Sequence, residues 1–72
     1  MKIPSREIVN QLREQYKPGM RVELAEMDDP QAPPAGTKGT VRWVDDIGTV
    51  FVKWDNGSGL GAAYGQDYIR IV

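Results

Sequence analysis

The stretch TVFVKWDNG, residues 49–57, contains the clearest strand and the clearest turn of this sequence. Val50, Val52 and Trp54 fall at every second position of its first part. Alternate side chains of a strand point to the same face, so these three share one side of the sheet. We therefore predict a strand over 49–54 with this apolar side turned into the core.

The end of the same stretch predicts a tight turn. Asn56 and Gly57 directly follow the strand, and more residues with strand character come after them. Asn-Gly is a preferred pair for hairpin turns because both residues tolerate positive φ. We expect positive φ at both positions.

The chain around this stretch continues the two-residue period in short segments separated by turns. The long connection MDDPQAPPAG, residues 27–36, is rich in proline and is expected to be an extended, exposed loop. Strand-like segments lie over residues 20–24, 38–44, 49–54, 60–64 and 68–72. Many short strands with frequent turns are typical of a small antiparallel barrel or meander.

The residues before the strands have a different period. Ser5 is a suitable N-cap, and Pro18-Gly19 ends the segment because proline disfavours helical geometry in the residue before it. Between them one apolar stripe has helical spacing: Ile8, Val9, Leu12 and Tyr16. We predict an amphipathic helix at about 5–16 that covers one open end or edge of the barrel.

These segments together predict a mainly β fold with one N-terminal α-helix. The fold class is a small SH3-like antiparallel barrel of about five strands, and residues 1–72 form a single domain with its barrel at about 20–72. The residues expected in the core are Leu12, Val22, Leu24, Val41, Val52, Trp54 and Ile71.

Composition argues against several functional classes. The 72 residues include no His and no Cys, so a thiol nucleophile, an imidazole base, a disulfide and the usual zinc sites are excluded. The paired carboxylates Asp28-Asp29 and Asp45-Asp46 lie in expected turns, where Asp accepts backbone hydrogen bonds. We therefore expect no enzyme activity, no catalytic residues, no cofactor and no metal.

The distribution of apolar residues bears on location. Apolar runs are only a few residues long, too short to cross a membrane. The first fifteen residues, MKIPSREIVNQLREQ, carry charges where a signal peptide is apolar. A cytoplasmic protein without a membrane partner is expected.

Several motifs carry a family resemblance that covers nearly the whole chain. They are IVNQLR (8–13), PGMRVEL (18–24), MDDP (27–30), APPAGTKGTV (32–41), VDD (44–46), Gly48 and VKWDNGS (52–58). The segment from Ile8 to Val72 resembles a small bacterial and phage family, domain of unknown function 4314. The resemblance implies an SH3-like barrel associated with phages, mobile elements and bacterial genomes, and it implies no activity. The chain is more distantly similar to the Mind-bomb/HERC domain, an SH3-like interaction module, which favours protein or peptide binding.

The aromatic residues suggest a binding site. If a bulge turns both Val41 and Val44 inward, Trp43 faces outward with Phe51 as its cross-strand neighbour. Such an exposed aromatic pair is a candidate contact surface for another protein or a peptide. The alternative is that the helix packs on this face and buries both rings.

The proline-rich loop is the second part of the candidate site. Asp28, Asp29, Pro33 and Pro34 are expected to be exposed there, and in SH3-like barrels this loop borders a groove for extended peptides. A stiff connection without function is the competing interpretation. We expect a non-catalytic protein-interaction module that binds through this loop together with Trp43 and Phe51.

A nucleic-acid-associated accessory protein of a mobile element is the alternative function. Arg42 and Lys53 flank the 45–48 turn and would contact phosphates. Binding to phosphates depends on clustered basic residues, and the pI of about 5.2 disfavours it.

Overall fold

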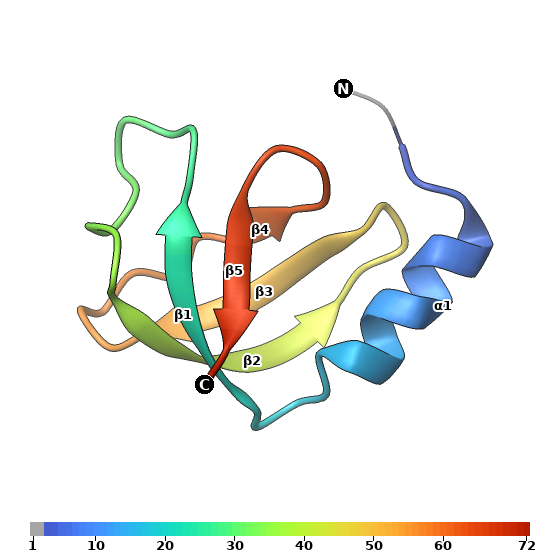
Figure 1. Cartoon of the computed structure of the whole chain (residues 1–72), viewed down its shortest axis with the longest axis horizontal. Coiled ribbons are helices and arrows are strands. Elements are labelled where there is room, and N and C mark those ends of the chain that lie inside the picture. Colours follow the sequence, from blue (N-terminus) through green and yellow to red (C-terminus); the bar gives the residue numbers. More distant parts are fainter. Residues whose placement is uncertain (1–2) are drawn as a thin grey trace.

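The computed structural model describes residues 3–72 and has one helix followed by five strands. Figure 1 shows the helix beside one end of a curved sheet. In chain order the elements are α1 (Arg6–Gln15), β1 (Arg21–Glu26), β2 (Lys38–Val44), β3 (Thr49–Trp54), β4 (Ala62–Ala63) and β5 (Tyr68–Ile71). The mainly β fold with an N-terminal helix is confirmed.

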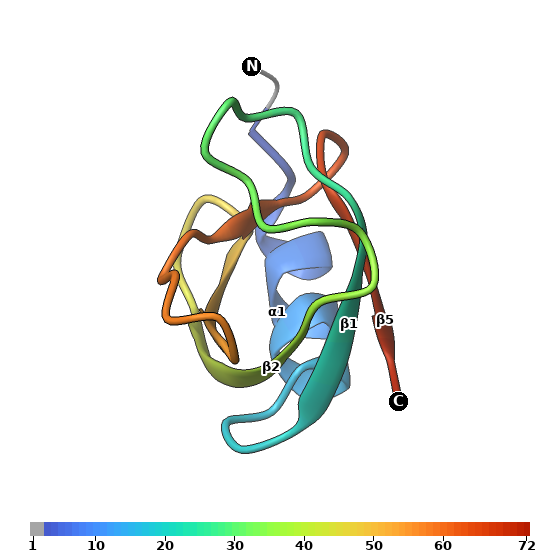
Figure 2. The ribbon, with the colours of Figure 1, turned by 90° about the vertical axis from the view of Figure 1, so that its left-hand side faces the viewer.

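All five strands belong to one antiparallel sheet. Their spatial order is β4-β3-β2-β1-β5, so the two shortest strands form its edges. Figure 2 shows how the sheet curls, with the gold β3 on one side and the teal β1 and red β5 on the other. Over residues 3–72 no strand ladder joins β4 to β5. The sheet therefore stays open, and the word barrel describes it only loosely.

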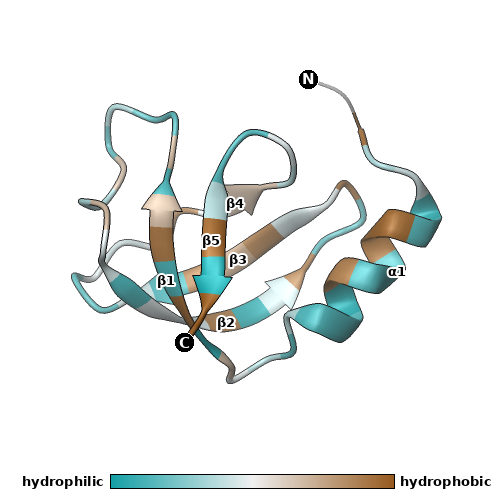
Figure 3. Cartoon of the chain, viewed as in Figure 1, coloured by the Kyte–Doolittle hydropathy of each residue, from teal (hydrophilic) through white to brown (hydrophobic). Residues whose placement is uncertain are grey.

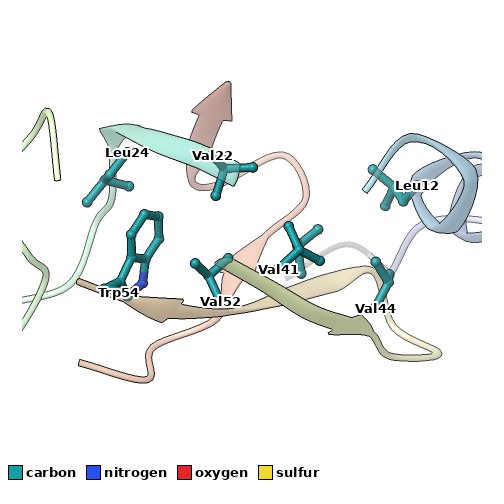
Figure 4. Packing of buried hydrophobic residues seen from close by; sticks show 8 residues of the cluster. Leu12, Val22, Leu24, Val41, Val44, Val52 and Trp54 are labelled. Carbon is teal, nitrogen blue, oxygen red and sulfur yellow. The ribbon is translucent and has the colours of Figure 1, made fainter. Parts of the chain in front are cut away.

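The core lies between the inner faces of the curled sheet. Val22, Leu24, Val41, Val52 and Trp54 are the largest fully buried side chains, and Figure 4 shows them gathered between the strands. Alternation places them inward, since β1 and β3 each bury every second residue at their centres. The Trp54 indole Nε1 donates a hydrogen bond of 2.9 Å to the Leu60 carbonyl, which satisfies its polar group inside the core.

Ile71 is the one expected core residue that the structure corrects. Its side chain is 45% exposed, although its register partner Val22 is fully buried. Ile71 ends β5, an edge strand at the end of the chain, and it does not belong to the core cluster. Ile71 therefore lies on the same face of the sheet as Val22, but no other element of the described chain covers that face at the end of the edge strand, so its side chain stays exposed.

Helix α1 packs through its expected stripe. Val9 and Leu12 are buried, Ile8 and Tyr16 pack against the core, and the Ser5 side chain accepts a hydrogen bond from the Ile8 amide. Figure 3 shows the alternation of apolar and hydrophilic residues on α1 and the strands. No helix in the described part of the chain is long and apolar enough to cross a membrane.

Two hydrogen bonds from Arg13 fix the helix to the sheet. Its Nε donates to the Val44 carbonyl at 3.2 Å, and its Nη2 forms an ion pair of 2.7 Å with Asp46. These contacts place α1 beside the 45–48 turn, which connects β2 and β3. The helix therefore covers one open end of the curved sheet, as the sequence predicts.

The turn after β3 is longer than the Asn-Gly pair suggests. Trp54 N donates to the Ser58 carbonyl, so three residues form the loop, and the Asn56 side chain accepts from Ser58 N at 3.0 Å. In a three-residue loop only the last position needs positive φ. Gly57 has φ +94°, whereas no non-glycine residue among residues 3–72 has positive φ. The expectation is confirmed for Gly57 and wrong for Asn56.

Gly57→Val is expected to destabilise this hairpin by about 1–3 kcal/mol, because a β-branched residue resists positive φ. No atom lies near a Cβ at Gly57, so the effect comes from the backbone alone. Urea denaturation measures it. Gly59→Val is the matched control, since Gly59 also has open space but no positive φ. Equal losses in the two variants would contradict the conformational explanation.

Candidate functional site

A β-bulge in β2 decides which side chains reach the outer face. The register pairs Val41 with Val52 and then Trp43 with Phe51, so Arg42 is the additional residue. This shift turns both Val41 and Val44 into the core, where they are 1% and 7% exposed. Trp43 is left 47% exposed on the outside. The bulge that the sequence analysis considered as a condition for an outward Trp43 is present in the structure.

The bulge also brings two aromatic rings together. The Trp43 and Phe51 ring centroids are 5.0 Å apart with an angle of 29° between the rings, a stacked arrangement. Phe51 is half-buried and lies against Gly61, where an added Cβ would be 3.4 Å from its ring. The helix does not bury the Trp43 ring, which is 47% exposed. Trp43 is therefore an exposed aromatic side chain that stacks on a half-buried ring.

Basic residues border the aromatic pair. The Arg42 Cζ lies over the Trp43 ring, 5.1 Å from its centroid. Lys53 is the register partner of Thr40 rather than of Arg42, yet both basic residues line the same open groove. We name this surface the aromatic groove; its lining residues are Thr40, Arg42, Trp43, Phe51, Lys53 and residues 57–59.

The basic residues of the groove take part in none of the ion pairs between described residues. Within residues 3–72 the ion pairs are Arg13–Asp46, Arg21–Asp55 and Arg70–Glu23. Arg21 donates to both Asp55 carboxylate oxygens, at 2.9 and 2.6 Å, and this hydrogen bonding lowers the pKa of Asp55. Asp55 lies two residues after Lys53 in the chain, but its carboxylate is hydrogen-bonded to Arg21. Neither Arg42 nor Lys53 forms an ion pair with any described residue.

The proline-rich loop contributes no lining residue to the aromatic groove. It joins the start of β2, whereas Trp43 lies near the other end of that strand, and Figure 1 shows the green loop far from the 45–48 turn. None of Asp28, Asp29, Pro33 and Pro34 lines the groove. The structure therefore does not bring the two parts of the expected site together.

The residues of this loop differ in their exposure to solvent. Asp28, Asp29 and Pro34 are exposed, whereas Pro33 is buried, which corrects the expectation that it is exposed. Hydrogen bonds at Leu24, from its amide to Thr37 and from Gly36 to its carbonyl, draw the loop back onto β1. A loop folded back in this way has an inner side, and Pro33 occupies it.

The acidic residues of the turns have structural partners. Asp29 accepts from Gln31 N, and Asp45 accepts from the amides of Ile47 and Thr49. Such bonds are the ordinary role of Asp in turns. Among residues 3–72 no three acidic side chains gather as a metal site would require.

Sequence reasoning missed a second cleft, at the opening between β4 and β5. Its walls include Leu12, Tyr16, Ala62, Tyr64, Tyr68 and Ile69, and burial raises the pKa of Tyr16. Tyr64 and Tyr68 are about half exposed, at 48% and 54%. This cleft is formed by α1 together with β3, β4 and β5, and α1 is far from these strands in the sequence, so only the number of tyrosines near the C-terminus could have indicated it.

The Asp67 side chain connects two segments of the chain beside this cleft. Its carboxylate accepts from Asp28 N at 3.0 Å and from Ala63 N at 2.9 Å. It therefore links the proline-rich loop to the turn between β4 and β5. Asp67 lies between the strand-like segments 60–64 and 68–72, and the sequence carries no signal for its contact with Asp28, which is 39 residues away.

Comparison with protein families places the whole fold within a known family model. A family model described as Domain of unknown function (DUF4314) matches residues 5–72, which include α1 and all five strands. No curated protein matches the chain. The similarity thus extends over the helix, the sheet and the aromatic groove.

Proposed function

The chain belongs to the family described as Domain of unknown function (DUF4314), and from this premise we propose that it is a non-catalytic protein-interaction module. The aromatic groove is its contact surface, and the partner is another protein or a peptide. A bacterial, phage or mobile-element protein acting in the cytoplasm is part of the same proposal.

The exposed Trp43–Phe51 pair carries this proposal. Large apolar side chains are usually buried, and an exposed stacked pair on a rigid surface is a common feature of binding sites. A buried aromatic anchor in an interface contributes about 2 kcal/mol or more, so two such residues support micromolar binding. Both rings lie on paired strands, and this fixed position lowers the entropy lost on binding.

Chemistry also favours binding over catalysis. The sequence has no His and no Cys, and its turn carboxylates accept backbone hydrogen bonds. The side chains that line the groove offer aromatic surface, positive charge and hydroxyls, without a carboxylate that could act as a base. These residues suit recognition.

Nucleic acid binding remains the second candidate because Arg42 and Lys53 line the same groove as the aromatic rings. Proteins that bind single strands combine basic grooves with aromatic surfaces. Salt distinguishes the two functions. Binding through many phosphates weakens steeply as salt rises, whereas binding centred on aromatic residues changes much less.

Trp43→Ala is expected to abolish binding to a partner isolated from the native host, because it removes the exposed half of the stacked pair. Arg42→Ala with Lys53→Ala should weaken binding without abolishing it. Isothermal titration with the purified partner measures both. Tyr68→Ala is the matched control, since Tyr68 is similarly exposed but lies outside the groove.

The opposite order of effects would reject the protein-interaction function. If the double variant abolishes binding, if Trp43→Ala retains it and if the affinity falls steeply with salt, nucleic acid binding becomes the better explanation. Thermal melting of each variant shows whether the fold is intact, and all four replaced side chains are exposed.

A further inference from the structure

We propose that the aromatic groove binds an acidic, extended segment of a partner protein. Arg42 and Lys53 bind carboxylates of that segment, while Trp43 and Phe51 contact an apolar side chain beside them. This inference rests on the proposed function and names the chemistry of its partner.

The groove presents hydrogen-bond donors with positive charge. Arg42 offers a guanidinium and Lys53 an ammonium, and neither has an acidic partner within residues 3–72. The Trp43 indole N–H likewise donates to no acceptor in this part of the chain, whereas that of Trp54 is bound to Leu60. Carboxylates are the complementary group, because bonds between charged donors and acceptors are stronger than neutral ones.

Arg42 is already held in place for such a contact. Its guanidinium lies over the Trp43 ring, and that ring is stacked on Phe51. A cation over an aromatic face is attracted by the ring electrons, which limits the conformations of the side chain. Less conformational entropy is then lost when a carboxylate binds.

The same arrangement favours a peptide over a nucleic acid. Phe51 stacks with the Trp43 ring and Arg42 lies over it, so a base that stacked on this ring would compete with both side chains. Two basic residues are also few for following a phosphate backbone, and the net charge of the chain is -1. A short acidic peptide needs only one or two such contacts.

The wall of the groove suits an extended main chain. Gly57 and Gly59 line it beside Ser58, and no atom lies within 4 Å of a Cβ built on either glycine. A partner backbone can therefore approach closely there. An extended segment places alternate side chains on one side, which allows an acidic and an apolar residue to face the groove together.

The experiment compares two short synthetic peptides and an oligothymidylate by fluorescence anisotropy. One peptide consists of glutamate with a central phenylalanine, and in the other every Glu is replaced by Gln. The native chain should bind the Glu peptide about tenfold tighter or more, as expected for loss of one charge-assisted bond. Arg42→Ala with Lys53→Ala should remove this difference.

Arg6→Ala with Lys17→Ala is the matched control. It changes the net charge equally, at two exposed residues that do not line the groove, and it should keep the preference for Glu. The inference is overturned if the control loses the preference as well, if neither peptide binds, or if the oligothymidylate binds tighter than the Glu peptide.

Two further outcomes relate this inference to the proposed function. If both peptides bind equally and binding still requires Trp43, the acidic preference is rejected while the protein-interaction function stands. If the Glu preference depends on Arg42 and Lys53 but Trp43→Ala leaves the binding of the native partner intact, the proposed function fails and the inference fails with it.

Discussion

Trp54→Ala is expected to unfold the domain. The side chain is 1% exposed and lies in the core with Val22 and Leu24, so its loss leaves a large cavity. Replacing a buried aromatic by alanine costs about 3–5 kcal/mol. A chain of this size without a disulfide has about 3–5 kcal/mol of stability from its core, so the expected loss is as large as the whole stability.

Thermal melting followed by circular dichroism measures this effect. Trp43→Ala is the matched control, because it removes the same side chain from an exposed position. The control should melt near the parent temperature, whereas Trp54→Ala should show no cooperative transition. Trp54→Phe keeps most of the apolar volume but loses the hydrogen bond to Leu60, and should be intermediate. A cooperative melt of Trp54→Ala near the parent temperature would show that Trp54 does not support the core.

Gly39→Ala is expected to cost about 1–3 kcal/mol or more, the range for inserting a methyl group into a packed core. A Cβ at Gly39 would lie 2.5 Å from Val52 Cγ1, 2.8 Å from the Lys53 carbonyl oxygen and 2.9 Å from Trp54 Cε3. The carbonyl belongs to β3, the strand paired with Gly39, so it cannot move without disturbing the ladder. Trp54 therefore packs directly over the backbone of β2.

Urea denaturation of Gly39→Ala, compared with Gly59→Ala, measures this requirement. Gly59 has open space around it and should accept alanine with little change. If both variants lose the same stability, the close approach of β3 to Gly39 is not what limits the side chain. If Gly39→Ala is as stable as the parent, β2 and β3 can separate without cost.

Local pattern was enough to predict most of the fold. The strand at 49–54, the helical stripe ending at Tyr16 and the bulge near Trp43 each follow from residues close together in sequence. The bulge is the most informative of these. Val41 and Val44 are three residues apart and would face opposite sides of a regular strand, so burying both requires one additional residue between them. The same reasoning placed Trp43 and Phe51 side by side.

The expectations that failed depend on distant contacts or on loop length. Ile71 has the correct alternation but lies uncovered at the end of an edge strand. Asn56 does not have the expected positive φ, because the hairpin loop has three residues rather than two and only its last position needs positive φ. Pro33 turned inward because Leu24 hydrogen-bonds to the far end of the loop.

The candidate site was likewise predictable only in part. Alternation indicated Phe51 and Lys53 as outer residues of β3, whereas Trp43 faces outward only because of the bulge in β2, and together with Arg42 these residues line one groove. The proline-rich loop is hydrogen-bonded back onto β1 and does not line this groove, and alternation along the strands does not determine that path. The pairing of Arg21 with Asp55, which leaves Lys53 without an acidic partner, joins residues 34 apart.

The two tryptophans give the protein its own pair of optical reporters. Trp54 lies in a dry apolar environment, whereas nearly half of Trp43 is in contact with water. Indole emission depends on the polarity around the ring, so the two fluorophores respond to different events. A dissolved quencher reaches Trp43 first, and a ligand in the groove would shield it, while Trp54 changes only when the core opens. Binding and unfolding can therefore be followed separately in the unlabelled protein.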